Sequence, residues 1–164
     1  MTPSRRTDGI SYHTRSDARA FLGSDLRTVS RLLARVKHTR TATKKRAIVE
    51  TICRTLAIQV QLEEEILSPT LRGKPRGREM LAEISGHHAN LKRLIADVQG
   101  VEPDDEFELN VVLIAAEIRR LEDLRDQHPG LARASTQERR ALGARLAMRR
   151  RELLESNERI GGWD

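Results

Sequence analysis

Apolar residues recur every three or four positions in four separate segments of this chain, and that spacing is typical of amphipathic helices. Prolines at positions 75, 103 and 129 fall between the segments, so one long coiled coil is disfavoured. The pattern predicts helices from about Ser16–Asp17 to His38, from Thr43 to Leu67, from Arg78 to Val98, and from the EPDDE stretch at 102–106 to Gln127.

Four such helices joined by short loops predict an all-α fold, an up-down-up-down four-helix bundle. The composition agrees, because aromatic residues make up only 2% of the chain. A capping-box pair, Ser135 and Glu138, predicts an additional helix over about 136–158. The expected organisation is a flexible arm over 1–15, the bundle over 16–130, and a basic amphipathic helix with its tail over 131–164.

Several polar residues lie on the apolar stripes, where the core is expected. Gln59 and Glu63 share the face of Ile52 in the second helix, and His88 lies on the apolar face of the third. Asp25 occupies a similar place in the first helix. Burying such groups costs several kcal/mol each unless they are paired or bind a metal. The sequence therefore predicts a polar site inside the bundle.

Three stretches carry a family resemblance: SDLRTVSRLL from Ser24, LAIQVQLEEEILSP from Leu56 and GHHANLKRLIADV from Gly86. They resemble the hemerythrin-like, or HHE cation-binding, domain. The family's second helix carries His-x-x-x-Glu and ends in Glu-Glu-Glu-Ile-Phe-x-Pro, which EEEILSP at Glu63–Pro69 matches closely. The resemblance covers about residues 17–127. It implies a four-helix bundle with a metal centre that handles oxygen, nitric oxide or iron.

This chain departs from the family's metal-ligand pattern at most positions. Leu26 and Gln59 stand where the family has histidines. Arg120 (or Arg119), followed by Leu124 and Arg125, stands at the ligand positions of the fourth helix. Glu63 and His88 alone match. A di-iron centre needs several carboxylates and imidazoles. We therefore expect no di-iron centre in this chain and no cofactor. The alternative is a reduced site at Glu63 and His88 that holds a single iron or other divalent ion.

A buried polar cluster of Glu63, Gln59, His88 and Arg120 is the arrangement we expect instead. In it a guanidinium of the fourth helix, from Arg120 or its neighbour Arg119, lies where the metal cation would otherwise be. The carboxylates Asp25, Glu117 and Glu122 are also near enough to be considered, but we expect them to pair with arginines.

Other functional classes have weaker support. Cys53, the single cysteine, lies at an apolar position and is expected to be a buried structural thiol rather than a nucleophile, so no enzymatic activity is predicted. The formal net charge of +6 and the arginines of the last helix permit weak, non-specific nucleic-acid binding, which is the second alternative. Acidic residues dilute that helix and aromatic residues for base stacking are missing, so a nucleic-acid partner is not favoured.

The leading expectation is a non-enzymatic structural, sensory or partner-binding module. The C-terminal helix could bind a protein partner or a second copy through Leu142, Leu146, Leu153 and Leu154. No segment approaches the length of a membrane span, and no apolar signal region follows the basic N-terminus. We therefore expect a cytoplasmic protein, of a bacterium, without a membrane partner.

Overall fold

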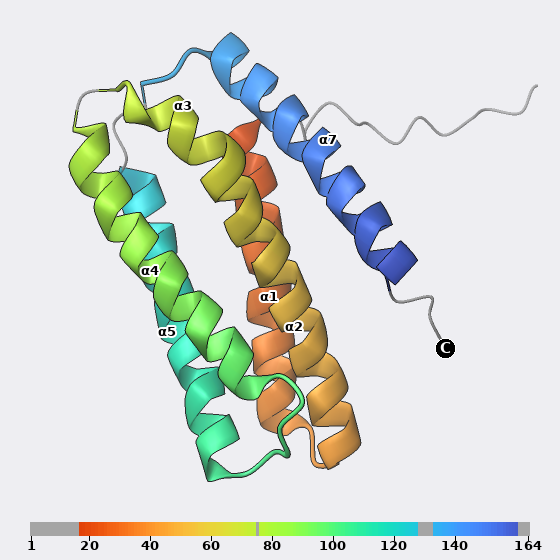
Figure 1. The fold of residues 1–164 in the computed structure, drawn as a ribbon. Coiled ribbons are helices and arrows are strands. Elements are labelled where there is room, and N and C mark those ends of the chain that lie inside the picture. The colour runs from red at the N-terminus through yellow and green to blue at the C-terminus, as the bar shows by residue number, and fades with distance from the viewer. Residues whose placement is uncertain (1–16, 75, 128–132, 161–164) are drawn as a thin grey trace, which may run out of the picture.

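The computed structural model describes residues 17–74, 76–127 and 133–160, with side chains up to residue 157, and these are helical throughout apart from short connections. The predicted arm over 1–15 lies outside the described residues. The elements are α1 (Ala18–His38), α2 (Ala42–Leu62), the π-helical turn η2 (Glu63–Leu67), α3 (Ser68–Arg72), α4 (Gly77–Val98), α5 (Asp105–Gln127) and α7 (Thr136–Ile160). The predicted all-α bundle with an additional C-terminal helix is confirmed (Figure 1).

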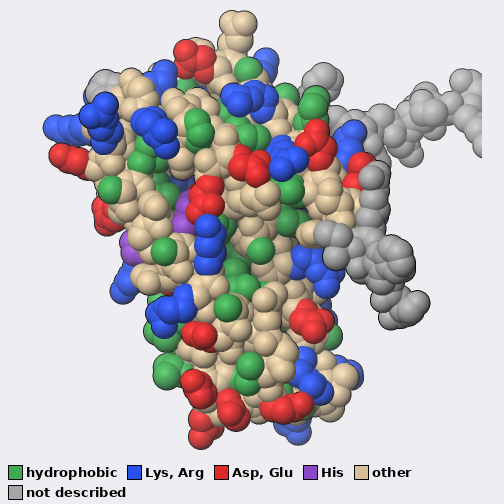
Figure 2. Space-filling model, viewed as in Figure 1, with side chains coloured by type: hydrophobic (Ala, Val, Ile, Leu, Met, Phe, Trp, Pro, Cys, Tyr) green, Lys and Arg blue, Asp and Glu red, His purple; other side chains and the backbone are tan. Residues whose placement is uncertain are grey.

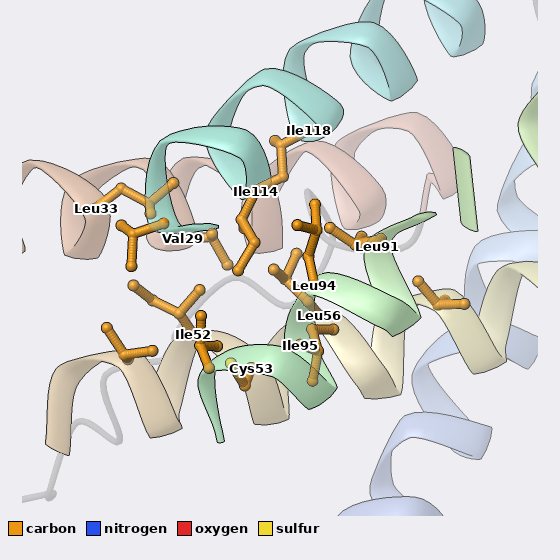
Figure 3. Packing of buried hydrophobic residues seen from close by; sticks show 14 of the residues in the cluster. Val29, Leu33, Ile52, Cys53, Leu56, Leu91, Leu94, Ile95, Ile114 and Ile118 are labelled. Carbon is orange, nitrogen blue, oxygen red and sulfur yellow. The ribbon is translucent and has the colours of Figure 1, made fainter. Parts of the chain in front are cut away.

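Four helices form the bundle, in the order α1, α2, α4, α5 around its axis. Each neighbouring pair is in contact, and the ring closes between α5 and α1. The core between them contains Val29, Ile52, Leu91 and Ile114, which point toward one another in Figure 3. The three-four spacing in the sequence therefore marks the buried face of each helix correctly.

Capping residues explain where three of the helices begin. Asp17 is the N-cap of α1 and accepts a hydrogen bond from the Arg19 N–H at 2.8 Å. Asp104 accepts from the Phe107 N–H at 2.9 Å, so α5 begins after Pro103 rather than including it in its first turn as predicted. The capping box before α7 is present, with Glu138 N–H bonded to Ser135 Oγ at 3.1 Å and Ser135 N–H to Glu138 Oε2 at 3.2 Å.

Glycine is required at the two turns that flank α4. A Cβ at Gly77 would lie 2.3 Å from the Leu71 carbonyl oxygen, so only glycine permits this close approach. Gly100 follows α4 with φ of +71°, a left-handed conformation that glycine adopts most readily and that commonly ends a helix.

The end of the second predicted helix differs from the expectation. Helical structure does not stop before Pro69 but continues through η2 and α3 to Arg72. A proline has no N–H to donate to the preceding turn, and a widened π turn is a known way to accommodate such an interruption. The Ser68 N–H instead reaches back five residues to the carbonyl of Glu63. The connection before α4 therefore spans only residues 73–76, whereas the predicted helices left 68–77 between them.

The helix α7 packs against its own chain, mainly on α1, α2 and η2 (Figure 1). Leu142 and Leu146 are buried there together with Leu22, Leu62 and Leu67. Two of the four leucines proposed from the sequence as a self-association surface are thus buried against the rest of the same chain, and Leu153 packs partly against the same cluster. The helix runs from Thr136 to Ile160, close to the predicted 136–158.

Candidate functional site

Glu63 lies inside the bundle, at the point where α2 passes into η2. Its side chain is 1% exposed. Gln59, one turn earlier, and His88, on α4, are buried as well. The structure therefore brings together three of the four residues predicted for the buried polar cluster.

The Glu63 carboxylate has partners on both oxygens. Oε1 lies 2.5 Å from Arg125 Nη2 and accepts a hydrogen bond from Gln59 Nε2 at 3.3 Å. Oε2 lies 3.0 Å from His88 Nε2. Burial raises the pKa of Glu63, but the charge of Arg125 and the hydrogen bonds from His88 and Gln59 outweigh it and leave the pKa below its ordinary value. The carboxylate is therefore held in its ionised form.

The fourth member of the cluster is Arg125, so the prediction of Arg120 is wrong. The Arg120 side chain is 63% exposed and lies 3.4 Å from Glu117 on its own helix, and Arg119 is also exposed. The physical reason is the helical period. Ile118 and Leu121 are buried, and the next position on that face is four residues after Leu121, namely 125. Extending this stripe by one turn would have identified Arg125.

The other two former ligand positions hold apolar side chains that pack in the core. Leu26 is 2% exposed, and Leu124 is partly buried against the same cluster. Neither side chain offers a donor atom to a cation, so the resemblance to the family's ligand pattern ends at these positions.

A second histidine–carboxylate pair lies beside the cluster but does not join it. His87 Nδ1 is 2.5 Å from Glu117 Oε2, and the Glu117 side chain is 9% exposed. Glu117 thus pairs with a histidine as well as with Arg120, whereas the sequence predicted an arginine only. Glu122, also considered, is half-buried and has no ion-pair partner among the described side chains.

The three consecutive glutamates contact three different parts of the molecule. Glu63 meets the cluster, Glu64 pairs with Lys92 of α4 at 2.7 Å, and Glu65 pairs with Arg149 of α7 at 2.8 Å. The hydrogen bond from Arg149 holds the pKa of Glu65 below its ordinary value. The turn η2 therefore connects the bundle core to both α4 and α7.

The donor set does not fit the metal centre that the resemblance implies. Among the residues that the structure describes, no group of three or more histidine, cysteine or carboxylate side chains is arranged to hold a metal ion. Glu63 and His88 are adjacent, but the Arg125 guanidinium lies against the carboxylate where a cation would bind. Gln59 Oε1 and Arg125 Nε, both buried, have no protein partner there. The Arg125 guanidinium is positively charged and the Gln59 amide is neutral, so neither supplies the negative charge that an iron centre needs from its ligands.

The comparison with protein families is consistent with this bundle. A family model described as hemerythrin HHE cation binding domain matches residues 17–129, which include α1 through α5. The chain belongs to this family. Neither a comparison with curated proteins nor one with solved structures gave a match.

The basic C-terminal helix lies outside the family match and is tied to the bundle by ion pairs. Arg139 contacts Asp17 at 3.1 Å, and Arg150 contacts the buried Asp25 at 3.0 Å while lying 5.7 Å from the ring of Phe21. With the Arg149–Glu65 pair, three of its arginines thus pair with acidic residues.

Burial raises the pKa of Asp25, and the charge of Arg150 offsets this only in part.

Basic and acidic side chains are interleaved on the face shown in Figure 2. In the described part of the chain, no helix is both long and apolar enough to cross a membrane.

Proposed function

We propose that this protein is a non-enzymatic, metal-independent member of the hemerythrin-like family that serves as a structural and partner-binding module in the bacterial cytoplasm. The observation that carries the proposal is the 2.5 Å contact between Arg125 Nη2 and Glu63 Oε1 in the centre of the bundle. The guanidinium carries the positive charge that a bound cation would otherwise supply to the carboxylate.

The chemistry of the site supports this substitution. Arginine does not deprotonate in proteins, so Glu63 keeps a permanent counter-charge. His88 and Gln59 complete the hydrogen bonds of the carboxylate, and Leu26 and Leu124, which stand at two of the former ligand positions, are apolar residues of the core. A divalent ion would have to displace Arg125, whose side chain is 9% exposed and has no second acidic partner among the described residues. The reduced metal site is therefore disfavoured.

The chemistry of Cys53 and Glu63 supports the non-enzymatic role. Burial and the nearby Glu50 raise the pKa of Cys53 to about 11, so its thiol is protonated at neutral pH. Glu63, the only fully buried carboxylate of the site, is committed to three partners and is not free to exchange a proton with a substrate.

Elemental analysis tests the proposal most directly. Protein produced with added iron, manganese and zinc should contain far less than one equivalent of any metal, and a chelator should leave its melting temperature unchanged. A Gln59→His/Arg125→Glu variant is the matched positive control, because it adds two donors beside Glu63 and His88 and should gain metal. Near-stoichiometric iron in the unmodified protein, with a charge-transfer absorption band, would refute the proposal.

A further inference from the structure

The outward face of α5 is apolar. Leu109 is 58% exposed, Val112 57% and Leu113 41%, and Ala116 continues the stripe at intermediate exposure. Their spacing of three, four and seven residues places them on one face, opposite the buried side of the helix. Three of the six large hydrophobic side chains that are exposed in the described part of the molecule lie in this stripe. Such a cluster of exposed apolar side chains is typical of an interaction surface.

Charged residues stand at both ends of the stripe and have opposite signs. Asp105 and Glu106 precede it in the first turn of α5, and Arg119 and Arg120 follow it. All four are exposed. Among the described side chains, Glu106 and Arg119 make no ion pair, and Arg120 makes only the contact with Glu117 inside its own helix. The stripe is thus acidic at one end and basic at the other.

We propose that this stripe binds the same stripe of a second copy of the chain, with the two α5 helices antiparallel. A two-fold axis between Val112 and Leu113 places these two residues opposite each other and Leu109 opposite Ala116. The same axis places Glu106 opposite Arg119 of the second copy, and Asp105 opposite Arg120. Every pair occurs twice, as an isologous interface requires. One register therefore matches the apolar residues and the charges together.

The charge pattern favours a second copy over other occupants. A nucleic acid or an anionic lipid surface would be repelled by the acidic end of the stripe. The helix α7 leaves this face open because it packs mainly on α1, α2 and η2. The proposal deepens the partner-binding role given above, but its test measures mass rather than metal, so either can fail without the other.

Analytical ultracentrifugation of the full chain over about two decades of concentration tests the interface. The unmodified protein should pass from monomer to dimer, and Leu113→Glu should remain monomeric. Met148→Glu is the matched control: Met148 is 66% exposed on α7, away from the stripe, so this variant should dimerise normally. Circular dichroism melts would verify that both variants are folded. A monomer at all concentrations, or equal behaviour of the two variants, would overturn the proposal.

A charge exchange tests the register. Glu106→Arg places like charges opposite each other at both ends of the dimer and should raise the dissociation constant about tenfold at low salt. Adding Arg119→Glu to that variant restores opposite charges in the exchanged order and should recover dimerisation. If the double variant dimerises no better than Glu106→Arg alone, the antiparallel register is wrong.

Discussion

Replacing Arg125 with methionine removes the guanidinium from the centre of the bundle and leaves the Glu63 carboxylate buried. Methionine keeps an unbranched apolar stem in place of the arginine stem and lacks only the terminal guanidinium atoms, so the change removes the charge while preserving much of the packing. His88 and Gln59 would still contact the carboxylate, at 3.0 and 3.3 Å, but the closest and only permanently charged partner would be gone.

The expected cost follows from the burial of the pair. Two unit charges 2.5 Å apart attract by about 7 kcal/mol at an effective dielectric constant of 20, and desolvation of both groups cancels most of this in the intact protein. Deleting one partner leaves the desolvation of the other uncompensated. We therefore expect the free energy of unfolding to fall by about 3–5 kcal/mol, which lowers the melting temperature by roughly 6–20 °C in a domain of this size.

Urea denaturation followed by circular dichroism measures this loss, and Arg120→Met is the matched control. Arg120 is 63% exposed, so its replacement should cost about 1 kcal/mol or less. The double variant Glu63→Gln/Arg125→Met should recover much of the loss, because no buried charge remains. Equal, small effects of Arg125→Met and Arg120→Met would refute the reasoning.

The pH dependence gives an independent check. The pKa of Glu63 is lowered in the folded protein, so its contribution to stability is present above its ordinary value of 4.5 and is lost as the pH falls through the folded value. The Arg125→Met variant has no such contribution to lose. The gap in stability between the two proteins should therefore narrow as the pH is lowered from 7 toward about 3.

Three further outcomes are expected. Asp25→Asn should raise the free energy of unfolding at pH 7, measured by urea denaturation, by about 1 kcal/mol or less. The pKa of Asp25 is raised in the folded protein, so the stability that its protonated form contributes is present below the ordinary value of 3.8 and is lost as the pH rises through the folded value. The gain from the substitution should therefore vanish near pH 3. Cys53 should react with a thiol reagent at pH 8 about a hundredfold more slowly in the folded protein than in denaturant, because its pKa is about 11 against an ordinary 9.0; equal rates would show that the thiol is accessible. Asp17→Ala should cost about 1–2 kcal/mol in thermal melts by removing the cap of α1, whereas Asp17→Asn, which can still cap, should cost less.

Helical periodicity predicted the inward side chains well. Glu63, Gln59 and His88 are polar residues on apolar stripes, and all three are buried. The same period also points to Arg125, but the choice of Arg120 followed the family's ligand positions instead of the stripe. The prediction failed where a pattern of residue types was preferred over the geometry of the helix in this chain.

Two other features could not be predicted from the spacing alone. A proline such as Pro69 normally ends a helix, and here the widened π turn η2 precedes it, so helical structure continues beyond it. The pairing of Arg150 with Asp25 depends on where α7 lies against α1, and the apolar pattern of α7 does not determine that placement. Contacts between helices distant in the sequence require the tertiary arrangement, which local periodicity does not contain.

The covalent attachment of Arg125 changes how the centre of this bundle is filled. The occupancy of an ion site follows mass action, so it varies with the supply of free metal and with competing ligands. A guanidinium on α5 is present at a fixed, high local concentration in every folded molecule. Its charge also stays the same under all redox conditions. The bundle can therefore complete its core as soon as α5 has been synthesised, before any encounter with another species.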